Sequence, residues 1–213
     1  MTVFAASFIY VLWRLFFTLP LNHGVLSLVW GILLWLSEST TVIETFTHFY
    51  NARHVKIPEM PEIPDDMYPD VDIMICTHNE TEELLFNTLN GCKYMDYPDK
   101  SKVHIWLCDD TDRPNVRALT ERMGVGYFGF TGNQHAKAGN INYGLERTSS
   151  PLVAIFDADM IPTSNFLMET VPYFFLRDMI QEDGVWRKRK PEEASSEKKL
   201  GYVQTQQSFY NPD

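Results

Sequence analysis

The sequence predicts an α/β domain with a mostly parallel, doubly wound sheet, preceded by a transmembrane helical hairpin. Three observations lead to this fold class. Apolar runs of strand length alternate with helical patterns from residue 71 onward, as in parallel sheets built from βαβ units. One such run, residues 153–156, is followed by Asp157 and Asp159, which suits a buried parallel strand that ends at a ligand site. Two apolar stretches lie within the first fifty residues.

The amino-terminal segment, residues 1–50, is predicted to form the hairpin. Residues 3–19 are mostly apolar and aromatic, and residues 25–36 form a second apolar run that continues as an amphipathic helical pattern. Each run by itself falls short of the roughly 20 residues that cross a hydrocarbon core of about 30 Å. A pair of buried helices in a soluble protein is therefore the alternative, and we expect the transmembrane hairpin.

The charged residues of this segment indicate how it is paired and oriented. Arg14 interrupts the first apolar run, and an arginine inside a membrane span needs a partner or a route to the interface. Glu38 and Glu44 are the candidate partners, and the pattern does not choose between them. Arg53 and Lys56 follow the second helix, which by the positive-inside tendency places the rest of the chain in the cytoplasm.

Residues 51–70 are predicted to be a linker and residues 71–213 the α/β domain. Prolines interleaved with acidic residues make the linker extended rather than helical. The expected strands are residues 71–76, 103–108, 127–130, 153–156 and 201–205. The expected helices are residues 80–92, 113–123, 139–147 and 165–177. Dense mixed charges with Gly, Pro and Ser mark residues 181–199 as a solvated surface insertion.

The overall charge limits the partners that the chain can take. Its 28 acidic and 18 basic residues give a net charge of −10, which argues against nucleic acid as a partner because Lys and Arg supply the affinity for phosphate backbones. One nucleoside diphosphate could still bind through a metal ion. The three cysteines show no disulfide-framework spacing and suit a reducing compartment.

Asp157 and Asp159 are the first candidate site. Residues two apart in an extended chain project to the same side, so the two carboxylates can face one hard cation such as Mg²⁺ or Mn²⁺. An isolated Asp-x-Asp pair is also compatible with an ordinary acidic turn. A third reading is a phosphatase-like hydrolase with Asp157 as the nucleophile. That motif normally opens its domain, whereas here three strand-like runs precede it.

Polar residues follow three of the predicted strands. They are residues 77–80, 109–110 and 157–159. Because the carboxyl ends of parallel strands share one edge of a sheet, these groups outline a cleft. Lys137 lies among small residues in the segment 135–140 at a predicted helix start, where an ammonium and backbone N–H groups can meet an anion. This segment is the natural diphosphate-binding counterpart of the two acidic strand ends.

These motifs, together with residues 204–205 and 209–213, resemble those of family 2 glycosyltransferases, and within them the processive β-glycan synthases of the bacterial cellulose synthase type. The resemblance covers nearly all of the chain, hairpin included. It implies a GT-A (Rossmann-like) nucleotide-sugar-binding fold and a UDP-sugar donor, with UDP-glucose favoured. Mg²⁺ or Mn²⁺ is the implied cofactor. The implied partners are a β-glucan acceptor, membrane lipid and an accessory synthase subunit, at the inner (cytoplasmic) membrane.

The resemblance also implies roles for individual residues. The nucleotide-sugar-binding residues are Thr77, Glu80, Asp110, Lys137 and Asp157. The metal ligand is Asp159, which forms the catalytic pair with Asp157. The acceptor-side residues are Phe209, Tyr210 and Asn211. One departure is visible, because relatives often carry Pro and Tyr where this chain has Cys76 and His78.

The family's general base lies in a Thr-Glu-Asp-like motif, followed by a Gln-x-x-Arg-Trp motif, and neither occurs in these 213 residues. We therefore expect the donor-binding portion of a synthase that transfers glucose from UDP-glucose to a growing β-glucan by inversion, with its domain incomplete at the carboxyl end. Since such a base contributes about 10²–10⁴-fold, the chain alone is expected to be inactive. A non-catalytic, UDP-binding membrane fragment is the alternative from a different class.

Overall fold

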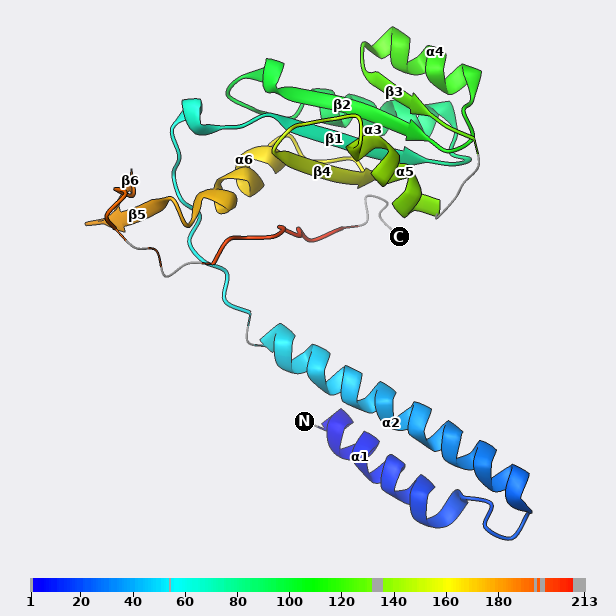
Figure 1. Ribbon diagram of the computed structural model, residues 1–213. Coiled ribbons are helices and arrows are strands. Elements are labelled where there is room, and N and C mark those ends of the chain that lie inside the picture. Colours follow the sequence, from blue (N-terminus) through cyan, green and yellow to red (C-terminus); the bar gives the residue numbers. More distant parts are fainter. Residues whose placement is uncertain (1, 54, 132–135, 194, 196–197, 209–213) are drawn as a thin grey trace. The chain divides into compact units, whose positions relative to one another are not determined.

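The computed structural model describes residues 2–53, 55–131, 136–193, 195 and 198–208. The chain divides into two compact units, which are coloured along the sequence in Figure 1. The helical unit spans Met1–Glu59 and the α/β unit spans Met60–Asp213.

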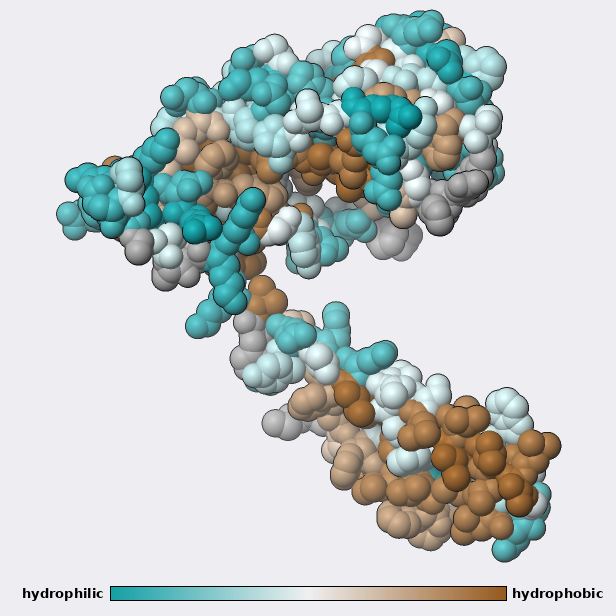
Figure 2. Space-filling view, viewed as in Figure 1, coloured by the Kyte–Doolittle hydropathy of each residue, from teal (hydrophilic) through white to brown (hydrophobic). Residues whose placement is uncertain are grey.

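The helical unit contains two helices that pack against each other. α1 (Thr2–Trp13) continues into a π-helical turn (Arg14–Thr18), and α2 spans Val25–Arg53. Among the described residues, α2 is the one helix long and apolar enough to cross a membrane, and Val3–Thr18 is a shorter apolar helix. Figure 2 shows the largely hydrophobic surface of this unit. The expected helix pair is present, and its placement in a membrane remains a proposal.

Polar contacts join the two helices along their length. Arg14 Nε donates to Glu38 Oε2 over 2.9 Å, so Glu38 rather than Glu44 is the partner of the arginine. Trp35 Nε1 donates to the carbonyl oxygen of Val11 over 3.0 Å. These contacts satisfy polar groups that would otherwise be costly in an apolar environment.

Four parallel strands form the sheet of the α/β unit (Figure 1). They are β1 (Val71–Thr77), β2 (Val103–Asp109), β3 (Gly126–Gly129) and β4 (Leu152–Asp157). The strand order is β3-β2-β1-β4, and the predicted parallel, doubly wound sheet is thereby confirmed. All seven residues of β1 are buried, as expected for a central strand covered on both faces.

Helices cover the sheet on both faces because successive crossovers run in opposite directions from β1. α3 (Glu82–Lys93) and α4 (Pro114–Met123) pack on the face that carries Ile73 and Ile75. α5 (Ala136–Leu145) covers the other face. The strand order changes direction between β1 and β4, and open α/β sheets bind ligands at the carboxyl ends of the strands at such a switch point.

The region after β4 differs from the predicted single helix over residues 165–177. α6 spans only Phe166–Thr170 and is followed by a 3₁₀ helix, Val171–Phe175. Pro172 explains the change, because proline lacks the backbone N–H and its ring clashes with the preceding turn of an α-helix.

The predicted surface insertion, residues 181–199, contains part of a β-hairpin. β5 (Met179–Glu182) pairs antiparallel with β6 (Val185–Lys188). Asp183 and Gly184 in the turn have φ of 52° and 80°, the two positive values that a type I′ hairpin turn requires. The Asp-Gly dipeptide is the sequence signal for this hairpin.

The predicted strand over residues 201–205 is wrong, since these residues form neither helix nor strand. Tyr202 is 77% exposed, so the apolar side chain that suggested a strand has no core to enter. A strand is stabilised by side-chain packing on a partly buried surface rather than by backbone preference alone.

Candidate functional site

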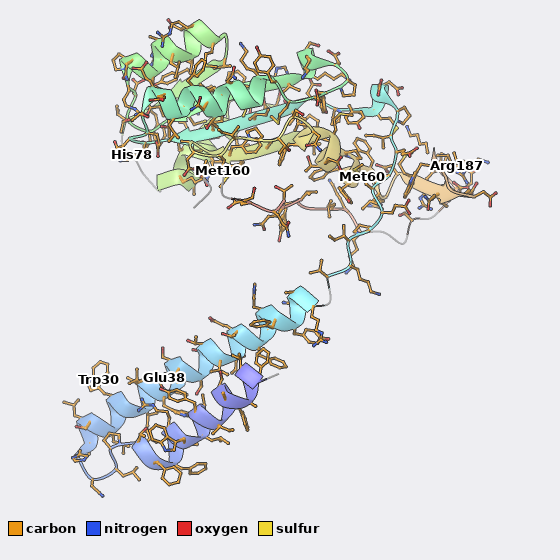
Figure 3. All side chains as sticks on the ribbon, turned by 180° about the vertical axis from the view of Figure 1, so that it is seen from behind. Trp30, Glu38, Met60, His78, Met160 and Arg187 are labelled. Atoms are coloured by element: carbon orange, nitrogen blue, oxygen red, sulfur yellow. The ribbon has the colours of Figure 1, made fainter. Side chains whose placement is uncertain are left out.

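The candidate site lies at the carboxyl ends of β1, β2 and β4. Thr77 at the end of β1 pairs in register with Asp109 of β2, and Cys76 pairs with Asp157 of β4. The prediction that three polar strand ends meet at one edge is therefore confirmed. Figure 3 shows two residues that follow β1 and β4, His78 and Met160, at the same end of the sheet.

A tight turn after β1 holds the first two predicted residues together. Glu80 Oε2 accepts hydrogen bonds from Thr77 Oγ1 and from the backbone N–H of His78, both at 2.7 Å. Burial raises the pKa of the Glu80 carboxyl, but these hydrogen bonds and the charge of Arg113 outweigh burial, so the pKa lies below its ordinary value. Glu80 is thus an ionised acceptor at the rim of the site.

Arg113 connects this turn to the end of β2 through hydrogen bonds and an ion pair. Its Nη2 donates to Thr77 Oγ1 and its Nη1 to the carbonyl oxygen of Glu80, both over 2.7 Å. Its Nε lies 3.2 Å from Asp109 Oδ2. Pro114 at the first helical position of α4 fixes the backbone that presents the guanidinium. One arginine therefore sets the relative position of two strand ends.

Asp109 is fully buried and accepts several hydrogen bonds. The backbone N–H of Arg113 donates over 2.8 Å, Thr111 Oγ1 over 2.8 Å and the Tyr127 hydroxyl over 3.0 Å. Burial raises the pKa of Asp109, but these donors outweigh it, so the pKa lies below its ordinary value. Burial, followed by the hydrogen bond to Asp109, raises the pKa of Tyr127. Asp109 is a structural carboxylate that faces inward rather than a group available to a ligand.

Asp110 is also buried and pairs with His78. The distance from His78 Nδ1 to Asp110 Oδ1 is 2.6 Å, with the imidazole 48% exposed and the carboxylate 6% exposed. The carboxylate therefore fixes the ring at the mouth of the site, where a planar ligand can lie against it.

Lys137 and Asp157 form an ion pair across α5 and β4, with side chains 50% and 41% exposed. Asp159 follows on an exposed turn that is closed by a 3.1 Å hydrogen bond from Met160 N to Asp157 O. Thr88 Oγ1 of α3 anchors the turn by donating to Ala158 O over 2.6 Å. Asp159 makes no hydrogen bond or ion pair with any residue of the described part of the chain, so its carboxylate is available to a ligand.

The acceptor-side prediction falls outside the described residues. Phe209, Tyr210 and Asn211 are not among them, and neither is His135 at the start of the lysine segment. The preceding chain does reach the acidic turn, because Gln207 Nε2 lies 3.6 Å from Met160 Sδ. The segment thus approaches the site, and the acceptor roles stay predictions.

Sequence reasoning missed Arg113 and the buried role of Asp109. Asp109 ends β2 and Arg113 is the N-cap residue of α4, so their four-residue spacing is not a helical one and gives no signal by itself. Nothing local to the sequence indicates the contact with Thr77, which is 36 residues away.

The oxygen ligands suit a divalent cation held together with a substrate. Within the described ranges, no group of three or more His, Cys, Asp or Glu side chains is arranged to hold a metal by itself. Mg²⁺ is usually bound by one or two carboxylates plus substrate phosphates, and the exposed carboxylate of Asp159 after the end of β4 suits that pattern.

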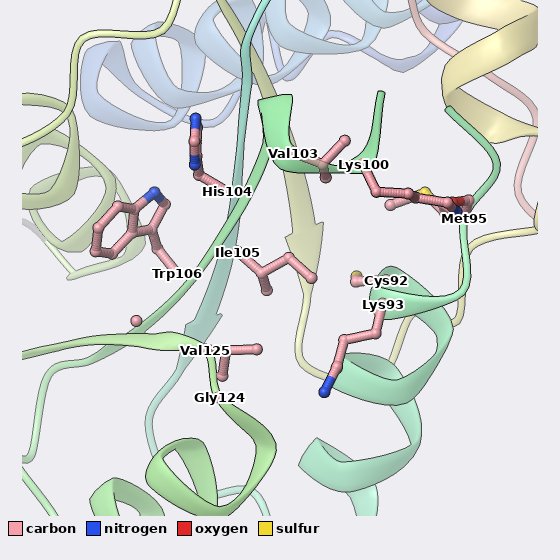
Figure 4. A pocket seen from close by; sticks show the side chains of 11 residues that line it. Cys92, Lys93, Met95, Lys100, Val103, His104, Ile105, Trp106, Gly124 and Val125 are labelled. Atoms are coloured by element: carbon pink, nitrogen blue, oxygen red, sulfur yellow. The ribbon is translucent and has the colours of Figure 1, made fainter. Parts of the chain in front are cut away.

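A cavity of about 350 Å³ lies away from this site (Figure 4). It is lined by residues at the amino ends of β2 and β3, including Val103, Ile105 and Gly126. Lys93 at its wall donates to the Met123 carbonyl over 2.6 Å. The candidate site is instead the open edge at the other ends of the strands.

Comparisons with known proteins give a family match and similar relatives. Residues 72–211 match the profile of the family Glycosyl transferase family 2. The chain is 32% identical over 211 residues to the UDP-forming cellulose synthase catalytic subunit of Xanthomonas axonopodis pv. citri (strain 306). It is 30% identical over 208 residues to cellulose synthase 1 of Komagataeibacter xylinus. These matches cover 98% and 96% of this chain but only 26% and 12% of the relatives.

A solved structure with a similar fold is the mannosyltransferase PcManGT from Pyrobaculum calidifontis, in complex with GDP-Man and Mn²⁺. The TM-score is 0.50 with 19% sequence identity, covering 66% of this chain and 42% of the other. At this identity the similarity concerns the fold alone.

Proposed function

This chain belongs to glycosyl transferase family 2, and we propose that it is the donor-binding portion of a membrane β-glycan synthase that uses UDP-glucose. The cellulose synthase relatives support this substrate class. Because the chain spans about a quarter or less of their length, polymer synthesis is a property that we propose for the whole enzyme.

The observation that carries the proposal is the pair Lys137–Asp157 at the switch point of the sheet, with the exposed Asp159 two residues further along the chain. An ammonium and carboxylates at such an edge suit a ligand that is itself anionic and brings a metal ion. A nucleoside diphosphate has both properties. Family membership makes the diphosphate part of a sugar donor.

We assign the two sides of the site to the two ends of UDP. Thr77, Glu80 and Asp110 lie around the turn after β1 and offer acceptors for the N–H of uracil and the hydroxyls of ribose. Lys137 contacts the diphosphate, and Asp157 supports the lysine and contacts the nucleotide. Asp159 is the proposed ligand of Mg²⁺ or Mn²⁺, and that ion would supply positive charge next to the departing diphosphate.

The chemistry proposed for the residues of this chain is stabilisation of the leaving group. An acceptor hydroxyl of the β-glucan attacks the anomeric carbon from the face opposite UDP, so the configuration inverts. Negative charge then grows on the diphosphate oxygen, where the Lys137 ammonium can donate a hydrogen bond. Preorganised donors at the atom that gains charge are usually the largest catalytic contribution of such a site.

We also propose that the helical unit lies in the membrane. α2 exposes large apolar side chains that include Leu33, Leu34 and Leu36, and lipid is the environment that suits them. Arg53 and Lys56 after α2 favour a cytoplasmic location for the α/β unit. The helices α1 and α2 would then form two passes.

Calorimetric titration of the full chain in detergent with UDP tests the donor site. Mn²⁺ should strengthen UDP binding, and Asp159→Ala should remove that gain. GDP should bind more weakly than UDP. Glu121→Ala, at an exposed acid on α4, is the control and should behave as wild type. UDP binding that is indifferent to both Mn²⁺ and Asp159→Ala contradicts the proposal.

A phosphatase-like hydrolase at Asp157 is not favoured, because the family profile spans this residue and because Asp157 is paired with Lys137.

A further inference from the structure

Three sulfur-containing side chains lie together on the face of the sheet covered by α5. Met74 and Cys76 alternate on β1, and Cys108 is in register with Cys76 on the neighbouring strand. Met74 is 0%, Cys76 9% and Cys108 0% exposed. The third cysteine, Cys92, belongs to the core on the opposite face.

The spacing of Cys76 and Cys108 suits a disulfide bond. Hydrogen-bonded neighbouring strands lie about 4.7–4.9 Å apart, and disulfides form when the Cα atoms are about 4.4–6.8 Å apart. In-register side chains on parallel strands point to the same face. Cys76 and Cys108 also belong to one cluster of buried residues together with Met74, so the two side chains share the same part of the core.

The two thiols differ in reactivity. The neighbouring Cys108 sulfur lowers the pKa of the Cys76 thiol, burial raises it and Lys137 lowers it, with a net lowering, whereas the Cys76 sulfur and burial raise the pKa of Cys108. The thiolate is the nucleophilic form of cysteine. Cys76 also keeps a small exposed surface while Cys108 has none. Cys76 is therefore the sulfur that reacts first with a small reagent.

The pair is directly connected to the candidate site. Cys76 immediately precedes Thr77, and Cys108 immediately precedes Asp109 and Asp110. Asn140 of α5 donates from Nδ2 to the Cys108 carbonyl over 2.7 Å. An S–S bond of about 2.05 Å is much shorter than a thiol–thiol contact. Forming it draws the ends of β1 and β2 together and displaces the residues that follow.

We propose that Cys76 and Cys108 are a dithiol site that low-molecular-weight disulfides oxidise to an intramolecular disulfide, and that this bond weakens donor binding. The second half of the proposal rests on the proposed function. The Cys76 thiolate attacks one sulfur of the small disulfide RSSR, which forms a mixed disulfide and releases one RSH after protonation. The Cys108 sulfur, having lost its proton, then attacks Cys76 Sγ and releases a second RSH. Two thiols are oxidised and one RSSR is reduced.

The first experiment detects the bond without reference to nucleotide. The full chain is incubated with oxidised glutathione, the remaining thiols are counted and blocked, and the protein is digested with trypsin and Glu-C without reduction. Cuts after Glu80 and Lys93 separate the three cysteines. Two of the three thiols should disappear, and the linked peptides should contain Cys76 and Cys108.

Cys92→Ser is the matched control, because burial raises the pKa of Cys92 to about 12 and leaves it unreactive. In this variant both remaining thiols should be oxidised, and the linked peptides should again contain Cys76 and Cys108. Retention of all three thiols in the wild type, or a bond that includes Cys92, overturns the dithiol site. A mixed disulfide with glutathione that never resolves also overturns it.

The second experiment compares UDP affinity before and after oxidation. Oxidation should weaken binding at least about tenfold, which is about 1.4 kcal/mol, and dithiothreitol should restore it. Unchanged affinity in protein with the mapped disulfide overturns the link to donor binding. If neither form binds UDP, the proposed function fails while the thiol count still decides the dithiol site.

Discussion

Arg113 donates from Nη2 to the hydroxyl of Thr77 over 2.7 Å, although Thr77 ends β1 and Arg113 lies in the loop between β2 and α4. The same guanidinium contacts the buried carboxylate of Asp109. The residue that closes the turn after β1 is therefore also the counter-ion of a charge at the end of β2. The geometry of the candidate site and the stability of the α/β unit are consequently both expected to depend on this side chain.

Arg113→Ala should destabilise the α/β unit by about 3 kcal/mol, because it leaves the buried Asp109 carboxylate without its counter-ion. The matched control is Arg117→Ala on α4, whose pair with Asp112 is half-exposed at 2.6 Å and should contribute little to stability. Urea unfolding of the full chain in detergent measures both. Equal losses for the two variants contradict the structural role of Arg113.

Lys137→Ala should change the stability of the α/β unit little and the affinity for UDP strongly. Its ion pair with Asp157 is half-exposed, so the unfolding free energy should change by about 1 kcal/mol or less. UDP affinity should fall at least about tenfold, because a hydrogen bond to a charged group contributes about 1.5–3 kcal/mol. The control is Arg122→Ala, at an exposed pair with Glu82, which should leave affinity unchanged. Calorimetry with Mn²⁺ present is the measurement.

The sheet and the positions of the acidic strand ends could be predicted because their signals are local. Apolar runs such as residues 71–76 read as strands, and the carboxyl ends of parallel strands must share an edge. Asp157 and Asp159 could be singled out because they follow a strand-like apolar run, but the expected projection from one strand is wrong for Asp159, since β4 ends at Asp157 and Asp159 lies in the turn that follows.

What could not be predicted depends on contacts between distant residues. The burial of the Asp109 carboxylate depends on Arg113, Thr111 and Tyr127, and the sequence alone does not show which of Asp109 and Asp110 these residues bind. The partner of Arg14 is likewise decided by how α1 and α2 align. The broken helix at Pro172 and the hairpin turn at Asp183 did have local signals, and reading them would have corrected both elements.

Acid should weaken the α/β unit through Asp109. Because its folded pKa lies below the ordinary value of about 3.9, its contribution is fully present above about pH 4 and is lost as the pH falls through the folded value. Asp109→Asn should therefore be less stable than wild type at pH 7, by about 1.5–3 kcal/mol, and the difference should shrink below pH 4.

Urea unfolding at a series of pH values measures this difference, and Asp112→Asn is the control. Asp112 has a positive φ of 48°, which Asn tolerates well. Its side chain is partly exposed in its pair with Arg117, so this variant removes a carboxylate from the same loop without removing a buried one. If the difference in unfolding free energy between wild type and Asp109→Asn stays constant down to pH 3, Asp109 is not the carboxylate whose protonation weakens the α/β unit.

The ion pair of Arg14 with Glu38 should couple the two helices during membrane insertion. A lone Arg or Glu near the middle of a span costs about 2.5–3.5 kcal/mol on insertion scales, whereas a pair can neutralise itself. A double-mutant cycle measures this coupling from the insertion of wild type, Arg14→Leu, Glu38→Leu and the double variant into microsomes. The coupling free energy should be at least about 1 kcal/mol. The matched cycle with Glu44→Leu should give about 0.5 kcal/mol or less, because Arg14 binds Glu38. Equal coupling in the two cycles would mean that the alignment of α1 and α2 differs in the membrane.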